Sequence, residues 1–120
     1  MLDTKYALVK YIVTLFTLVV VGICCLVAHG ATDAQPVVIM FTAEYCGPCH
    51  YALRVIDEEQ AQNKLTGIEL RILDIQKNAA MAQQWAITAT PTFLVGTRNQ
   101  GIVLRTHDVR EALEKAKQLR

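Results

Sequence analysis

The sequence predicts an α/β protein in which a central, mixed, four-stranded sheet is flanked by helices and preceded by an N-terminal hydrophobic helix. Three observations support this prediction. Residues 11–28 contain no charge, residues 37–42 are an apolar run of strand length, and residues 68–75 alternate apolar and polar side chains. Alternation of this kind is typical of a strand, and the total of 120 residues leaves room for one small domain.

The N-terminal 30 residues are expected to be a signal peptide or a transmembrane anchor. The uncharged run at 11–28 is intermediate in length between a signal-peptide core and a membrane-spanning helix, and it would provide the contact with the membrane. Lys5 and Lys10 precede this run, so the following chain should face away from the cytoplasm. We therefore expect an inner-membrane-anchored or secreted protein, with its folded domain in the periplasm or another extracytoplasmic space.

The exported part divides into a short polar linker at 31–36 and a domain at 37–120. The apolar run at the start of this domain is expected to be a strand buried on both faces. The element order is β-α-β-α-β-β-α, with a parallel first pair of strands and a final hairpin. The expected elements are a strand at 37–42, a helix at 48–63, a strand at 68–75, a helix at 78–86, strands at 92–95 and 102–105, and a helix from 108 to 119.

Side-chain spacing within these helices predicts which residues face the core. Leu53 and Ile56 should point inward from the first helix of the domain, and Met81 and Trp85 should do so from the second. The last helix presents an apolar face, and Asp108 with Glu111 predicts its capped start. That apolar face is formed by Val109, Ala112, Leu113 and Ala116.

Charge and cysteine content narrow the class of function. Residues 31–120 carry ten basic and ten acidic side chains, so no basic face is expected and nucleic acid is not an expected partner. Cys24 and Cys25 fall within the apolar run, where cysteine commonly acts as a small hydrophobic residue. Cys46 and Cys49 form the only Cys-x-x-Cys in the chain.

The position of Cys46-Gly47-Pro48-Cys49 between a strand and a helix gives its two sulfurs different chemistry. At a helix start, backbone N–H groups and the helix dipole stabilise a thiolate, so Cys46 is expected to be the attacking nucleophile. Cys49 lies further into the helix and is expected to resolve the mixed disulfide. Pro48 suits a first helical turn, where a missing N–H costs little.

Two segments resemble the thioredoxin family. Ala43 to Cys49 (AEYCGPC) is similar to its active-site motif, and Ala89 to Phe93 (ATPTF) is similar to its cis-proline loop. The resemblance covers residues 36–119 and implies a thiol–disulfide oxidoreductase acting on protein disulfides outside the cytoplasm. It further implies a reductase that needs no cofactor or metal. Because the expected export would place this reductase in an oxidising compartment, we also expect a membrane electron donor. The residues that it assigns to substrate binding are Tyr45, Gly47, Pro48, Thr90 and a cis Pro91.

This sequence departs from the family pattern in several places. The strand and helix that usually precede the active-site strand are not found before it, and Tyr45 and Thr42 replace two tryptophans. Met40 occupies the position of a buried aspartate that assists proton transfer at the resolving cysteine. His50 replaces a lysine, and its i+4 spacing from Cys46 predicts an imidazolium that lowers the pKa of the Cys46 thiol.

Other functions are compatible with parts of the same sequence. Cys46 to His50 also satisfies the C-x-x-C-H pattern of c-type haem attachment, with Met81 or His107 as a second axial ligand. A zinc site would need two ligands beyond the cysteine pair, and His50 and His107 are the candidates. A redox-inert thioredoxin-fold interaction module is a third alternative, favoured by Met40.

Overall fold

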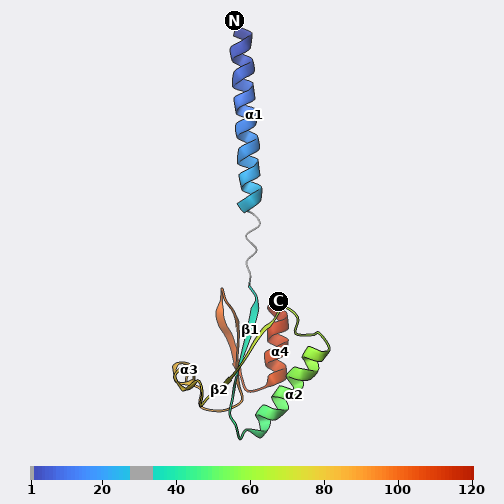
Figure 1. Ribbon diagram of the computed structural model, residues 1–120, viewed down its shortest axis with the longest axis vertical. Helices are drawn as coiled ribbons and strands as arrows, with labels where there is room; N and C mark the ends of the chain where they lie inside the picture. Colours follow the sequence, from blue (N-terminus) through green and yellow to red (C-terminus); the bar gives the residue numbers. More distant parts are fainter. Residues whose placement is uncertain (1, 28–33) are drawn as a thin grey trace. The chain divides into compact units, whose positions relative to one another are not determined.

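A computed structural model describes residues 2–27 and 34–120, and the chain forms two compact units, Met1–Thr32 and Asp33–Arg120 (Figure 1). The first unit is helix α1, Leu2–Val27, and the second contains the sheet and the other helices. Residues 28–33, which include half of the expected linker at 31–36, lie outside the described residues. The linker therefore stays a prediction.

Helix α1 corrects the expectation about the membrane. It begins at Leu2, so that Asp3, Lys5 and Lys10 lie within the helix rather than before it. Over the described residues, no helix combines the length and the apolar character that a membrane crossing requires. The predicted location, as an inner-membrane-anchored or secreted protein, is wrong on this finding. The expected membrane contact through residues 11–28 is not supported either.

The second unit contains a mixed four-stranded sheet, as the sequence predicts, and its strands lie in the order β2-β1-β3-β4. The first pair, β1 and β2, is parallel, whereas β1–β3 and β3–β4 are antiparallel. The parallel pair arises because helix α2 carries the chain from one end of the sheet back to the other. The strands are β1 at Pro36–Thr42, β2 at Glu69–Asp74, β3 at Thr92–Thr97 and β4 at Gly101–Thr106.

Helices cover both faces of this sheet (Figure 1). Helices α2, Gly47–Ala61, and α4, Val109–Gln118, pack on one face over a core that includes Val38, Met40 and Phe93. On the other face, a smaller cluster around Phe41 and Leu94 includes Ala82 of α3, Ala79–Gln84. The strand β1 is central and contributes to both clusters, which explains its continuous apolar sequence.

The predicted core faces are mostly found in the structure. Ile56 is buried, Leu53 is half-buried against the main cluster, and Trp85 packs against the smaller one. The predicted inward side chains of α4 are all buried. Met81 is the exception: it is 38% exposed, because α3 is a helix of six residues and presents only Ala82 fully to the sheet.

The ends of the helices place the loops that matter for the site. Asp108 caps α4 by accepting hydrogen bonds from the amides of Arg110 and Glu111, as predicted. Lys117 of α4 donates to Glu59 of α2 at 2.7 Å, which joins the two helices on the same face of the sheet. The start of α2 and the loop before α4 are thereby fixed at the same end of the domain.

Candidate active site

The two cysteines lie where β1 passes into α2. Cys46 is the N-cap of α2, with an extended backbone (φ −121°, ψ 99°), and its Sγ accepts a hydrogen bond from the Cys49 amide at 3.2 Å. Pro48 follows in the first helical turn, where the proline ring suits the helical φ and no N–H is needed. A sulfur therefore takes the capping place that serine or aspartate usually fills.

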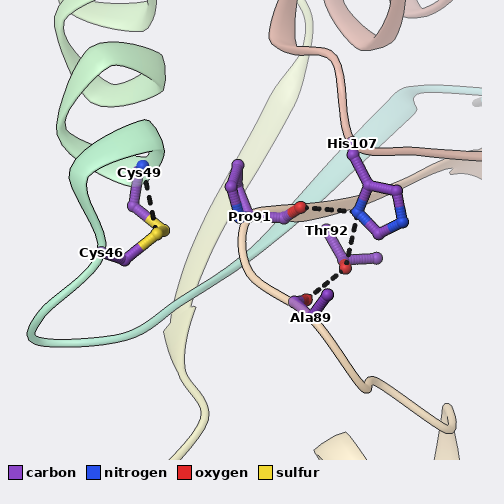
Figure 2. Close-up of a disulfide and its surroundings, with 6 residues drawn as sticks. All are labelled: Cys46, Cys49, Ala89, Pro91, Thr92 and His107. Atoms are coloured by element: carbon purple, nitrogen blue, oxygen red, sulfur yellow. Dashed lines mark hydrogen bonds between the residues drawn. A yellow bond between two sulfur atoms is a disulfide. The ribbon is translucent and has the colours of Figure 1, made fainter.

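Cys46 and Cys49 are joined by a disulfide whose Cα atoms are 5.2 Å apart (Figure 2). The two residues differ in exposure: Cys46 is 7% exposed and Cys49 is 1% exposed. Both belong to the main core cluster, so the disulfide closes one end of the core. Attack on a sulfur requires a free approach to it. Because Cys46 is the more exposed residue, an incoming thiolate or disulfide reaches it more easily than it reaches Cys49.

The loop that ends in Pro91 faces the disulfide (Figure 2). The Thr90–Pro91 peptide bond is cis, which confirms the prediction made from the resemblance of this loop. Pro91 is buried and Thr90 is half-buried, and Thr92 follows as the first residue of β3. Two chain segments about 40 residues apart are thus brought together at one end of the sheet.

A surface groove of about 730 Å³ lies beside the disulfide. Pro48 from the cysteine turn and Pro91 from the opposite loop both line it, which places two of the predicted substrate-binding residues together. The remaining wall comes from α2 and from the loop that begins α4. The other lining residues are Tyr51, Ala52, Thr106, His107, Asp108, Val109 and Arg110.

Two arginines surround Tyr51 at the rim of this groove. The Arg110 guanidinium donates to the Tyr51 hydroxyl at 3.4 Å, and the Arg54 guanidinium lies 5.7 Å from the centre of the Tyr51 ring. The hydrogen bond to Tyr51 is the main reason that the pKa of Arg110 is raised above its ordinary value. The groove therefore combines apolar proline surfaces with charged residues of both signs, Arg110 and Asp108.

Met40 is completely buried in the cluster that contains both cysteines. It lies in β1 between Ile72 of β2 and Phe93 of β3. Where the resemblance expects a buried carboxylate, this chain has a thioether, which neither donates nor accepts a proton. Any proton exchange at Cys49 must therefore use another group or water.

The remaining predicted site residues lie on the surface around the cysteines. Tyr45 is 94% exposed, and Gly47 is exposed at the start of α2. The side chain of His50 is also exposed, and its amide donates to the Cys46 carbonyl at 3.3 Å. The roles given to these residues stay predictions, and so does the effect of His50 on the Cys46 thiol.

The structure favours none of the haem or zinc alternatives. The disulfide engages both sulfurs that a haem attachment would use. Nδ1 of His107, proposed above as a metal ligand, instead contacts the Pro91 carbonyl at 2.8 Å. In the part of the chain that the structure describes, no three His, Cys, Asp or Glu residues are grouped in a way that could hold a metal ion.

Sequence reasoning did not find Tyr51, Arg110 and His107 as members of the groove. Tyr51 and Arg110 are 59 positions apart, and only the packing of α2 beside α4 brings them together. The proximity of His107 to Pro91 follows from the pairing of β3 with β4. The capped start of α4 at Asp108 was the one sequence feature that pointed to this loop.

Comparison with known proteins agrees with this architecture. The family model described as Thioredoxin matches residues 27–119. A thioredoxin H-type of Chlamydomonas reinhardtii is 35% identical over 91 residues, which cover 72% of this chain and 78% of that protein. A thioredoxin Y of Oryza sativa, named as chloroplastic, is 32% identical over 63 residues, 51% of this chain and 36% of that protein. The chain thus spans about a third of that relative's length.

Solved structures give the same result. The thioredoxin NaTrxh of Nicotiana alata superimposes with a TM-score of 0.64 at 28% identity, covering 72% of this chain and 75% of that one. Thioredoxin O2 of Arabidopsis thaliana, in its oxidised state, gives a TM-score of 0.60 at 26% identity, with coverages of 72% and 76%. The chain therefore belongs to the thioredoxin family and is a thiol–disulfide oxidoreductase.

Proposed function

We propose that this chain reduces protein disulfides by dithiol exchange, with Cys46 as the nucleophile and Cys49 as the resolving residue. The observation that carries the proposal is the unequal placement of the two sulfurs at the start of α2. Cys46 is the more exposed residue of the two, and its sulfur accepts the Cys49 amide hydrogen bond. A hydrogen bond and a helix start both favour the thiolate form of that sulfur.

The reaction proceeds in two exchanges. The Cys46 thiolate attacks one sulfur of the substrate disulfide, forming a mixed disulfide and releasing the first substrate thiolate. The Cys49 thiolate then attacks Cys46 Sγ, forming the disulfide of the oxidised protein and releasing the second substrate thiolate, which takes up a proton from water. The substrate gains two electrons and the protein loses two, and a dithiol donor restores the reduced pair.

The groove beside the disulfide supports a role in holding the substrate chain. In this proposal the exposed Tyr45 and Gly47 contact the substrate on the cysteine side, together with Pro48. Thr90 and Pro91 contact it from the opposite loop. Pro48 and Pro91 both line the groove, so a peptide lying there would contact both the cysteine turn and the opposite loop.

The reducing direction rests on the residues between the cysteines. Gly47-Pro48 is the dipeptide of the reducing members of the family, whose reduction potentials are about −270 mV. Equilibration of the protein with glutathione buffers of graded composition would measure its potential. A value above about −200 mV, near those of oxidising relatives, would contradict the reductase proposal.

The test of the proposal compares the two single cysteine variants. Cys49→Ser should accumulate mixed disulfides with a protein substrate such as insulin, because the first exchange occurs and the second does not. Cys46→Ser should form none and should lose insulin reduction, because the proposed nucleophile is absent. Non-reducing electrophoresis with mass spectrometry measures the adducts.

The outcome that contradicts these roles is equally direct. Adducts on Cys46→Ser and none on Cys49→Ser would reverse the assignment. Full insulin reduction by either variant would show that the reaction does not need the pair. Cys24→Ser serves as a matched control, because it makes the same replacement outside the Cys46–Cys49 pair.

A further inference from the structure

His107 connects the end of β4 to the loop that faces the disulfide. Its Nδ1 atom lies 2.8 Å from the Pro91 carbonyl oxygen and 3.3 Å from the Thr92 hydroxyl oxygen. The Thr92 hydroxyl in turn lies 2.6 Å from the Ala89 carbonyl (Figure 2). One imidazole and one hydroxyl thus connect β4 to both ends of the four-residue segment 89–92.

The direction of these hydrogen bonds follows from the atoms involved. A carbonyl oxygen only accepts, so Nδ1 of His107 must carry a hydrogen and donate it to Pro91. The Thr92 hydroxyl donates its hydrogen to Ala89, which leaves its oxygen free to accept from the same Nδ1–H. This arrangement needs a donor at the δ position of residue 107, and a donor at the ε position cannot replace it.

The contact lies where the backbone ladder ends. The last pair of the β3–β4 ladder is Phe93 with Thr106, so the next residues are Thr92, which begins β3, and His107, which follows β4. The Pro91 nitrogen has no hydrogen to donate, and the side chain of His107 provides the bond that continues the connection. In the view of Figure 2, the Pro91 ring lies between the disulfide and the imidazole.

We propose that His107 is a positioning residue that fixes segment 89–92 for substrate binding. The inference rests on the proposed function, in which Thr90 and Pro91 contact the substrate chain. His107 acts through the Pro91 carbonyl and the Thr92 hydroxyl and does not contact the sulfurs. Its loss therefore weakens substrate binding and leaves the exchange at Cys46 unchanged.

The chain offers a matched pair of substitutions. His107→Asn keeps a side-chain N–H at the δ position, and His107→Gln moves it to the ε position. Pre-reduced protein is mixed with increasing concentrations of a disulfide-bonded peptide, and single-turnover oxidation gives a half-saturation concentration and a maximal rate. His107→Gln should raise the half-saturation concentration about three- to tenfold, with a maximal rate within about twofold of the wild type. His107→Asn should restore most of the binding.

Two further measurements separate positioning from general damage. Oxidation by a small aromatic disulfide, which is too small to lie along segment 89–92, should proceed at the wild-type rate in both variants. Nitrogen NMR of the wild type should show the Nδ1–H form of His107. Equal half-saturation concentrations for the wild type and His107→Gln would overturn the inference, and so would equal losses in the two variants or an Nδ1 without hydrogen.

Failure of the proposed function would give a different result. A wild-type chain that reacts with the small disulfide but shows no saturable reaction with any peptide disulfide would contradict protein-disulfide reduction itself, and the role of His107 with it. A wild-type chain that saturates with the peptide, while His107→Gln behaves identically, would contradict the role of His107 alone. Urea unfolding of each variant establishes that the compared proteins are folded.

Discussion

At the scale of single residues, the environment of the cysteine pair is more apolar than the resemblance to thioredoxins predicts. Met40 is fully buried in the cluster that holds Cys46 and Cys49. A thioether fills this space without needing a hydrogen-bond partner, whereas a carboxylate there would need one. This chain therefore has a well-packed core at the place where the family pattern has a proton-transferring group.

Introducing that group should be costly here. We expect Met40→Asp to lower the free energy of unfolding by about 2–4 kcal/mol at neutral pH, since it removes buried apolar volume and buries a polar group. Burial raises the pKa of the new carboxyl above its unfolded value, so the loss should shrink as the pH falls through the folded value and be smallest below about pH 4, where the group is neutral in both states. Urea unfolding measures the effect. Met40→Leu should cost less than about 1.5 kcal/mol, and equal losses would contradict this account.

The active cysteines could be predicted from the sequence, whereas the groove could not. Cys46, Cys49 and Pro91 lie in two short motifs with recognisable local patterns. His107 was considered only as a metal ligand, because nothing in its sequence neighbourhood indicates a bond to the Pro91 carbonyl. That bond depends on the register of β3 against β4, which is set by the whole hairpin.

At the scale of elements, the hairpin of β3 and β4 shows how close packing restricts sequence. The ladder shifts register between Val95 and Gly96, and the strands extend to Thr97 and from Gly101, beyond the predicted ends at 95 and 102. The strand bounds expected from the sequence, 92–95 and 102–105, leave Gly96 and Gly101 in the turn. After the register shift, Gly96 pairs with Ile102 and approaches the Gly101 carbonyl closely, which local composition does not reveal.

Gly96 should tolerate no side chain. A Cβ atom at this position would lie 2.0 Å from the Gly101 carbonyl oxygen and 2.9 Å from the Ile102 Cα. Both are backbone atoms, so the hairpin itself would have to move. We expect Gly96→Ala to lower the free energy of unfolding by roughly 2–3 kcal/mol, measured by urea denaturation. Gly47→Ala is the matched control, because a Cβ there meets nothing within 4 Å, and a comparable loss in both would contradict the prediction.

The contact between α2 and α4 should depend on pH. Lys117 donates to Glu59 at 2.7 Å, and this bond is the main reason that the pKa of Glu59 is lowered and a main reason that the pKa of Lys117 is raised. Because the pKa of Glu59 is lower in the folded state than its unfolded value of 4.5, the carboxylate stabilises the fold at any pH above 4.5. This stabilisation is lost as the pH falls through the lowered pKa of the folded state. Lys117→Met should therefore cost about 0.5 kcal/mol near neutral pH and almost nothing in acid.

Unfolding curves of wild type and Lys117→Met across the acidic range would test this pH dependence. Lys115→Met is the control, because Lys115 lies on the same helix and the described part of the chain shows no ion pair for it. A difference between wild type and Lys117→Met that persists undiminished in acid would show that the lysine acts through packing rather than through charge.

At the scale of the whole molecule, the chain consists of a helical unit and a thioredoxin-fold unit, Met1–Thr32 and Asp33–Arg120. The members of both core clusters come from the second unit. Its mixed sheet, with a parallel first pair and a final hairpin, agrees with the sequence prediction because the patterns of its strands are strong, whereas the β1–β3 pairing that joins them was not predicted. The sequence predicted the helix α1 but not the cellular location of the protein, because an uncharged run of residues indicates a helix more reliably than it indicates a cellular compartment.

We propose residues 37–120 as the catalytic domain, and we expect removal of residues 1–32 to leave folding and chemistry intact. The urea midpoint and the rate of oxidation by a small aromatic disulfide should equal those of the full chain, because the core clusters are retained. Extending the deletion through β1 should abolish cooperative unfolding, since this strand pairs with both β2 and β3. A lower midpoint for the shorter deletion would show that α1 contributes to stability.

Because a sulfur caps α2 where an oxygen is usual, the protein needs to rearrange little between its disulfide and dithiol forms. The Cys49 amide already points at Cys46 Sγ while the disulfide is closed. When the disulfide opens, the negative charge that forms on that sulfur meets a donor whose orientation the helix has fixed in advance, so no dipole has to turn toward it. The Cys49 amide therefore does for the Cys46 thiolate what a water molecule would otherwise do. The hydrogen bond that caps the helix also keeps the reorganisation energy of the exchange at Cys46 small.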